Sequence, residues 1–204
     1  MTVTKIEAVS KTKYDVFLDN QFAFVLYKGE LSHYQIEEGA EIEETVVQEI
    51  KQNVIVKRAK LRAMHLLNDM DRTEGQLRDK LKANHYTEDV IDEALRYVKS
   101  FGYVNDLNYA KRFIESKKDK KSRKELYALL CNKGLAKDLI EEAFEECYDR
   151  EDSKSAIEGL MRKKRYSPET ATEKEKQKMY GYLMRKGFAY EDVRQVIQVS
   201  GWNA

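Results

Sequence analysis

A repeat that fills the chain from about residue 57 onward constrains the fold more than any other feature. Three stretches, which begin at Leu77, Leu126 and Met179, carry apolar residues at matching positions and follow one another at intervals of 49 and 53 residues. Repeats of this length are typical of stacked helical units, because one unit alone cannot bury its whole apolar face. The sequence therefore predicts a helical repeat protein.

Each repeat contains a helix, a tight turn and a second helix. The turn falls at His85, Gly134 and Gly187, where the first helix has to end in a left-handed residue, a conformation that glycine adopts most easily. Apolar residues at helical spacing follow the turn, as in the series Ile140, Ala143, Phe144 and Cys147. An earlier helix completes each repeat, so we expect three-helix modules of about 50 residues.

The first 27 residues alternate between apolar and polar side chains, which is typical of β-strands. Asp19-Asn20 separates two of these strands, and both residues tolerate the left-handed backbone of a two-residue hairpin turn. Lys28 to Tyr34 is compatible with a short helix, Gly39 marks a turn, and the helical pattern starts near Glu43. Three short strands are not stable alone, so we expect the sheet to pack on a helix.

The predicted fold class is therefore mainly α, with three tandem three-helix modules in an elongated helical array and a small N-terminal antiparallel β element. We place the β-hairpin and short-helix extension at 1–56, module 1 at 57–105, module 2 at 106–152 and module 3 at 153–204. Because the repeat supplies apolar faces of its own, we expect the modules to fold without residues 1–56.

The composition predicts a cytoplasmic protein without catalytic machinery. No apolar stretch approaches the roughly 18–20 residues that span a bilayer, and the N-terminus lacks the apolar core of a signal peptide. Cys131 and Cys147 lie at apolar helical positions and are expected to be buried free thiols. The three histidines lack metal-ligand spacing, and no phosphate-binding or catalytic motif occurs. We expect no enzyme activity, no catalytic residues, no metal, no cofactor and no membrane contact.

Charge is divided unevenly along the chain. Residues 1–56 hold 5 lysines and 10 acidic residues, whereas residues 57–204 hold 32 basic and 26 acidic residues. The helix predicted from Lys137 to Asp149 nevertheless exposes an acidic face, made of Asp138, Glu141, Glu142, Glu145 and Glu146. Phosphates would repel that face, so the sequence argues against a recognition helix that enters the major groove.

Basic residues gather between the first and second helices of modules 2 and 3. The two clusters are Lys117, Lys118, Lys120, Lys121, Arg123 and Lys124, and then Arg162, Lys163, Lys164 and Arg165; a third group, Lys57, Arg58, Lys60 and Arg62, opens module 1. One interpretation is an ordinary solvated surface. The other is a basic stripe that contacts DNA or an acidic partner, if successive clusters face the same way. The acidic run from Asp138 to Asp152 is a second candidate contact surface.

Three segments are similar to those of a known family: Arg72-Thr73-Glu74 with Leu77 and Leu81; Gly102-Tyr103-Val104-Asn105-Asp106 followed by Tyr109-Ala110; and Leu130 with Lys133-Gly134-Leu135. With them the chain resembles the RecX family, regulators of the RecA recombinase. The resemblance covers all three modules, and the N-terminal strands look like the extension of Gram-positive members. Thr73 stands where the family has serine, and His85 stands where glycine is usual.

The resemblance implies a non-catalytic modulator that binds the RecA–DNA filament, lodges in its helical groove and inhibits filament growth and activity. RecA filaments would be the partner in homologous recombination, DNA repair and the SOS response, with weak and non-specific DNA binding by a monomer. The alternative left open by the sequence is a stand-alone DNA-binding protein without sequence specificity.

Overall fold

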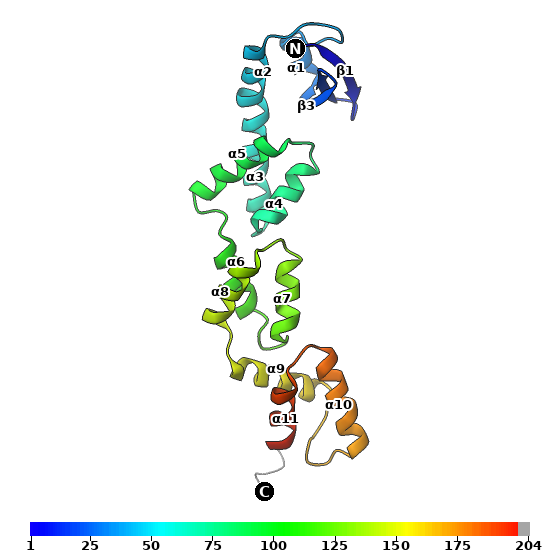
Figure 1. The fold of residues 1–204 in the computed structure, drawn as a ribbon, viewed down its shortest axis with the longest axis vertical. Coiled ribbons are helices and arrows are strands. Elements are labelled where there is room, and N and C mark those ends of the chain that lie inside the picture. The colour runs from blue at the N-terminus through cyan, green and yellow to red at the C-terminus, as the bar shows by residue number, and fades with distance from the viewer. Residues whose placement is uncertain (200–204) are drawn as a thin grey trace. The chain divides into compact units, whose positions relative to one another are not determined.

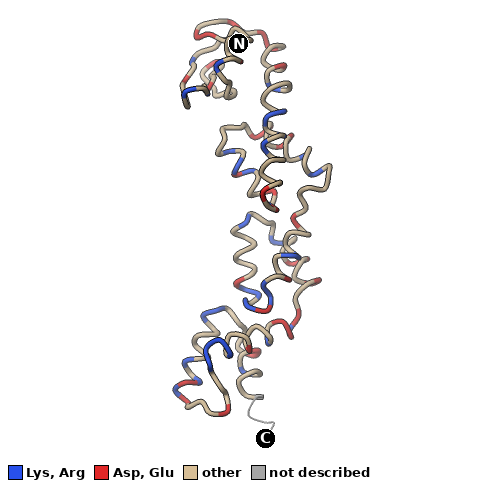
Figure 2. Tube along the Cα trace, turned by 180° about the vertical axis from the view of Figure 1, so that it is seen from behind, with Lys and Arg blue, Asp and Glu red and all other residues tan. Residues whose placement is uncertain are grey.

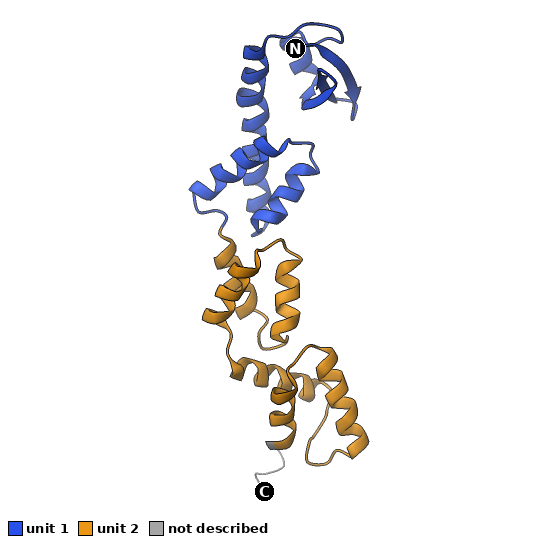
Figure 3. Ribbon diagram, viewed as in Figure 1, with its two compact units in different colours: residues 1–104 blue, residues 105–204 orange. Residues whose placement is uncertain are grey.

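The computed structural model describes residues 1–199 and is mostly helical, with a small antiparallel sheet near the N-terminus (Figure 1). The chain forms two compact units, residues 1–104 and residues 105–204 (Figure 3). Unit 1 contains β1 (Val3–Ala8), β2 (Lys13–Leu18), β3 (Gln21–Tyr27), α1 (Lys28–His33), α2 (Glu44–Ile50), the π-helical segment η1 (Lys51–Val56), α3 (Lys57–Asp69), α4 (Glu74–Lys82) and α5 (Glu88–Ser100). Unit 2 contains α6 (Asp106–Glu115), α7 (Arg123–Cys131), α8 (Lys137–Cys147), α9 (Arg150–Lys163), α10 (Glu173–Arg185) and α11 (Tyr190–Val199).

The sheet has the strand order β1-β2-β3, and all of its pairs are antiparallel. Asp19 and Asn20 form the turn between β2 and β3 with φ angles of 47° and 65°, and Leu18 pairs with Gln21 across it. This confirms the predicted hairpin, because a two-residue turn with two left-handed residues matches the twist of the strands. One face of the sheet is apolar and buried, as the alternation in the sequence requires.

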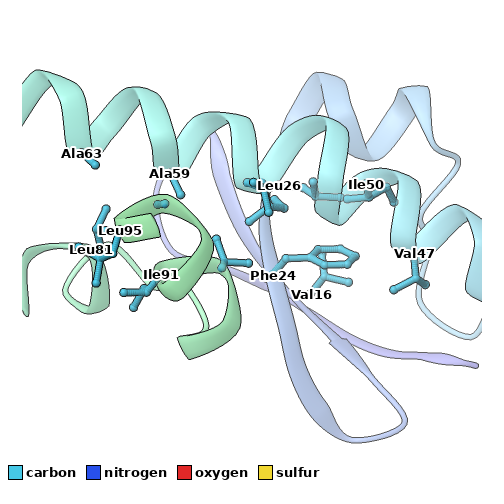
Figure 4. Close-up of a cluster of buried hydrophobic side chains, with 14 of the residues drawn as sticks. Val16, Phe24, Leu26, Val47, Ile50, Ala59, Ala63, Leu81, Ile91 and Leu95 are labelled. Carbon is cyan, nitrogen blue, oxygen red and sulfur yellow. The ribbon is translucent and has the colours of Figure 1, made fainter. Parts of the chain in front are cut away.

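The apolar face of the sheet packs on one long helical segment, formed by α2, η1 and α3 without a break (Figure 4). Val16 and Phe24 lie beneath the α2 end of this segment, near Ile50, and Ala63 at the other end faces the side of α5 that carries Leu95. The buried residues from Val3 to Val104 form a single cluster. The helical segment passes through the boundary predicted at residue 56, so the side chains on both sides of it share one core.

Left-handed residues end several helices, including those at the three predicted turns. His85, Gly134 and Gly187 have φ angles of 61°, 82° and 86°. At each turn two backbone hydrogen bonds close the helix end; in module 2, Gly134 N donates to Cys131 O (2.9 Å) and Leu135 N donates to Leu130 O (3.4 Å). This pair of bonds satisfies carbonyls that the last helical turn would leave unpaired.

Unit 2 has two apolar cores, one for each of its modules. The predicted series after the module 2 turn is confirmed at Ile140, Ala143 and Phe144, which are buried, whereas Cys147 is only half-buried. The modules meet where the buried Ser122 caps α7 by accepting a hydrogen bond from Glu125 N (3.1 Å) and donates one to Lys186 O (2.6 Å) at the end of α10. One hydroxyl therefore connects the start of a module 2 helix to the turn of module 3.

Candidate functional site: a basic surface on unit 2

The basic cluster of module 2 lies in the loop between α6 and α7 and at the start of α7 (Figure 2). Four of its six side chains form ion pairs, and three of these pairs are with carboxylates on helices. Lys118 Nζ contacts Asp152 (3.2 Å) and donates to the Cys147 carbonyl (3.2 Å), Lys121 pairs with Glu125, and Arg123 pairs with Glu141 (2.5 Å). These three cations are engaged by other residues of unit 2 and are less available to a partner.

The other three cations of this cluster are more accessible. Lys120 is exposed and contacts only the neighbouring Asp119, at 3.1 Å. Lys117 is half-buried, with its ammonium 5.2 Å from the centre of the Phe113 ring, and Lys124 is exposed. Within residues 1–199, neither Lys117 nor Lys124 forms an ion pair.

The basic cluster of module 3 is entirely exposed. Arg162 and Lys163 are the last two residues of α9, where cations interact favourably with the negative end of the helix dipole. Lys164 lies 5.2 Å from the centre of the Tyr182 ring, and Arg165 adopts a left-handed φ of 52° as the chain leaves the helix. None of the four forms an ion pair with any described residue, so the charge here is uncompensated.

Gly159 marks the point where the α6–α7 loop meets α9. A Cβ atom on Gly159 would lie 3.6 Å from the backbone oxygen of Asp119, so the α6–α7 loop packs against α9 at this point. Arg162 and Lys163 follow Gly159 by three and four residues, which places them on the same face of the helix. Lys120, next to Asp119, and the cations at the end of α9 therefore lie near one stretch of α9, and we term them the α9 basic surface. It comprises Lys120, Arg162, Lys163, Lys164 and Arg165.

The cations that open module 1 do not form an equivalent surface. Lys60 pairs with Glu93 (2.8 Å), and this bond holds the pKa of Glu93 below its usual range. Arg58 pairs with Glu30 and donates to the Val25 carbonyl (3.0 Å). These contacts tie α3 to α5 and to the N-terminal sheet.

The helix that follows the turn in module 2, α8, keeps the predicted acidic face. Asp138, Glu142 and Glu145 are exposed along it. Two further exposed acids are paired with unit 2 cations, Glu141 with Arg123 and Glu146 with Lys111 (2.6 Å). The bond to Glu146 raises the pKa of Lys111. The remaining negative charge disfavours contact between α8 and a phosphate backbone.

Within residues 1–199 there is no group of three or more His, Cys, Asp or Glu side chains placed to hold a metal ion. Cys131 and Cys147 are free, and burial raises the pKa of the Cys147 thiol, which disfavours the reactive thiolate. In the same residues we find no helix with the length and apolar character needed to cross a bilayer.

Comparisons with known proteins agree over almost the whole chain. Residues 59–97 match the family model described as the first three-helix domain of RecX, and residues 151–197 match the third. A regulatory protein RecX from Caldanaerobacter subterraneus is 35% identical over 202 residues, which is 98% of this chain and 100% of that protein. Another from Clostridium beijerinckii is 30% identical and covers 97% of this chain and 94% of its own length.

Two solved structures have the same fold. The crystal structure of a regulatory protein RecX superimposes with a TM-score of 0.62 at 23% identity, and covers 97% of this chain and 98% of that one. The crystal structure of RecX from Lactobacillus salivarius has a TM-score of 0.60 at 24% identity, and covers 72% of this chain and 97% of that one.

Proposed function

Because the chain belongs to the RecX family, we propose that it binds the filament that the RecA recombinase forms on DNA and inhibits the growth and activity of that filament. The observation that carries this proposal is the α9 basic surface, whose arginines and lysines at the end of α9 have no carboxylate partner within residues 1–199. Exposed and uncompensated cations are the side chains that a phosphate backbone attracts most strongly. We further propose that the protein acts without catalysis, as a monomer, in the cytoplasm where RecA filaments form.

The proposed DNA contact is weak and independent of sequence. Phosphate contacts position a protein on DNA but carry no sequence information, which has to come from contacts with base edges. The helix best placed to read a groove, α8, exposes Asp138, Glu142 and Glu145 instead of basic or amide side chains. We therefore assign DNA a supporting role and the RecA protein the main one.

Reversal of three accessible charges tests the proposal. The variant carries Lys120→Glu, Arg162→Glu and Lys163→Glu, and it leaves the paired Lys118 and Lys121 in place so that the loop stays folded. We expect weaker suppression of the DNA-dependent ATPase of RecA. Each phosphate contact contributes about 0.7 to 0.9 to the log–log salt slope, so DNA binding should lose about 2 to 3 of that slope.

A matched variant with Lys28→Glu, Lys57→Glu and Arg96→Glu controls for net charge, because it reverses three exposed cations of unit 1. It should suppress the ATPase as the wild type does. If the α9 basic surface variant also retains wild-type suppression and the same salt slope, the cations form an ordinary solvated surface. The acidic run from Asp138 to Asp152 then becomes the better candidate for the partner contact.

A stand-alone DNA-binding protein without sequence specificity is the second candidate, and the same uncompensated cations favour it. Fluorescence anisotropy with labelled DNA in the absence of RecA separates the two. Saturable binding at physiological salt, together with no effect on the ATPase of RecA, supports the stand-alone function. Binding that is lost at physiological salt while the ATPase is still suppressed supports the filament modulator.

A further inference from the structure

Unit 1 contains a groove of about 660 Å³. Its lining residues come from an earlier part of the sequence than the α9 basic surface and include apolar and aromatic side chains as well as cations. Its walls come from the sheet, from α3, and from the turn between α4 and α5. The lining residues are Val9, Lys13, Val25, Tyr27, Arg58, Leu61, Arg62, His65, Ala83, Asn84, His85 and Tyr86. None of these residues is an aspartate or a glutamate, and two carboxylates contact the lining from outside it: Glu30 pairs with Arg58, and Asp15 Oδ2 lies 3.4 Å from His85 Nδ1.

One face of α3 supplies the floor of this groove. Arg58, Leu61, Arg62 and His65 follow the i, i+3, i+4, i+7 spacing that places residues on one side of a helix. The core takes a different side of the same helix, where Ala59, Ala63 and Leu66 are buried. The groove face is thus not needed for the core of unit 1, yet it carries Leu61 with 67% of its surface exposed.

Arg62 is the residue that most needs a partner. Its Nε atom is buried and has no hydrogen-bond partner in residues 1–199, and its guanidinium forms no ion pair there. Arg58 differs, because Glu30 and the Val25 carbonyl already hold its guanidinium. Buried polar atoms in folded proteins are nearly always hydrogen-bonded, and buried charges are nearly always paired. The side chain of Arg62 as a whole is only half-buried and lines the groove, so an anionic group in the groove would pair with its charge, with Lys13 on the wall of the same groove.

The two tyrosine rings that line the groove are poorly placed to stack on nucleic-acid bases. Arg58 lies 4.5 Å from the centre of the Tyr27 ring, and Lys13 lies 5.6 Å from it, so cations already cover this ring. Tyr86 is half-buried against the core, and burial raises the pKa of its hydroxyl. Binding of single strands relies on freely accessible aromatic faces. The exposed side chains of Leu61 and Val9 offer aliphatic contact instead.

We infer that this groove binds an acidic peptide segment of a protein partner, with a carboxylate on Arg62 and an apolar side chain against Leu61 and Val9. Carboxylates match the planar guanidinium, which can donate two parallel hydrogen bonds. The groove between the modules of unit 2 is a useful contrast, because Asp149, Glu191 and Asp192 line it beside its cations. The inference concerns unit 1 and does not depend on the DNA contact proposed for unit 2.

The test uses the full chain and a short fluorescein-labelled peptide built from glutamate and leucine, followed by fluorescence anisotropy. We expect Arg62→Gln to weaken binding about tenfold or more, which is typical for loss of a charged hydrogen-bond partner. Lys57→Gln is the matched control, because it removes a cation of the same helix outside the groove, and it should bind within about twofold of the wild type. Leu61→Ser, at an exposed position, gives a second reading if Arg62→Gln disturbs folding.

Two further probes identify the occupant. The matching peptide built from glutamine and leucine should bind much more weakly, because it lacks carboxylates. Oligothymidylate should not displace the acidic peptide. The inference is overturned if the acidic peptide does not bind, if Arg62→Gln and Leu61→Ser both bind it like the wild type, or if oligothymidylate occupies the groove in its place.

Discussion

Replacing Gly187 with alanine should loosen the joint between the two modules of unit 2. Gly187 occupies the module 3 turn with a left-handed φ of 86°. A Cβ atom there would lie 3.0 Å from Ser122 Oγ and 3.1 Å from Lys124 Cβ. Ser122 cannot move away easily, because its hydroxyl caps α7 and also donates to Lys186 O. The substitution therefore disturbs both the turn and the contact that the turn makes.

The structure gives a magnitude for this effect. The left-handed conformation costs a residue with a Cβ roughly 1–2 kcal/mol, and an overpacked contact costs about 1–3 kcal/mol more. The free energy of unfolding should therefore fall by about 2 kcal/mol or more. For a unit of about 100 residues, each kcal/mol lowers the melting temperature by roughly 4–8 °C. We expect the transition of unit 2 to move down by about 8 °C or more.

Scanning calorimetry of the full chain measures this shift, with Gly181→Ala as the matched control in α10. At Gly181 the nearest atom to an added Cβ is the flexible end of Arg185, at 3.3 Å. Removing a glycine from the interior of a helix should stabilise unit 2 by about 0.5–1 kcal/mol. The two variants add the same methyl group and should have opposite effects. An unchanged melting temperature for Gly187→Ala would refute the geometry of the joint.

Removal of residues 1–56 should destabilise module 1, because Val16, Phe24 and Ile50 belong to the same buried cluster as Ala63 and Leu95. Thermal unfolding of the truncated chain can be followed by circular dichroism. If the truncated chain still unfolds cooperatively, the modules fold without residues 1–56, as the sequence predicted. The Lys60–Glu93 pair should make unit 1 sensitive to acid. The pKa of Glu93 lies below its ordinary 4.5 because Lys60 donates to it, so its contribution to stability is present above that value and is lost as the pH falls through the lowered pKa. Urea unfolding at several pH values measures how the free energy of unfolding falls in acid, and this fall should be shallower in Lys60→Gln. A fall as steep as in the wild type would argue against the pair.

The features that the sequence predicted correctly depend on local rules. Asp19-Asn20 predicted a hairpin because few residue types tolerate the left-handed backbone that this turn needs at two successive positions. Gly134 and Gly187 predicted helix ends because a left-handed residue, most often glycine, follows many helices. His85 shows how far such a rule extends. It has a φ of 61° without being glycine, so the periodic apolar residues around it were a better indicator of the turn than the residue at the turn itself.

The state of the basic cluster in module 2 could not be predicted from its composition. Lys118 is held by Asp152, and Arg123 by Glu141, and these partners are separated by 34 and 18 residues. A charge count cannot distinguish such paired cations from free ones, since the pairing depends on how α8 and α9 pack. The Lys121–Glu125 pair was predictable, because its partners are four residues apart at the start of a helix. The groove beside Arg62 was missed because its lining comes from three distant segments.

The repeat conserves the buried positions of the modules but not the segment between their first and second helices. In module 1 this segment contains Asp71 and Arg72, whereas in module 2 it contains four lysines. Packing constrains the residues that face the core, and it leaves a solvent-exposed connection free to change its charge. The lysine-bearing loop also packs on α9, because the backbone oxygen of Asp119 lies within van der Waals reach of Gly159. A basic surface can thus arise at one joint of a repeat protein without being repeated at the others, which is why we look for the DNA contact on unit 2 and for a different ligand on unit 1.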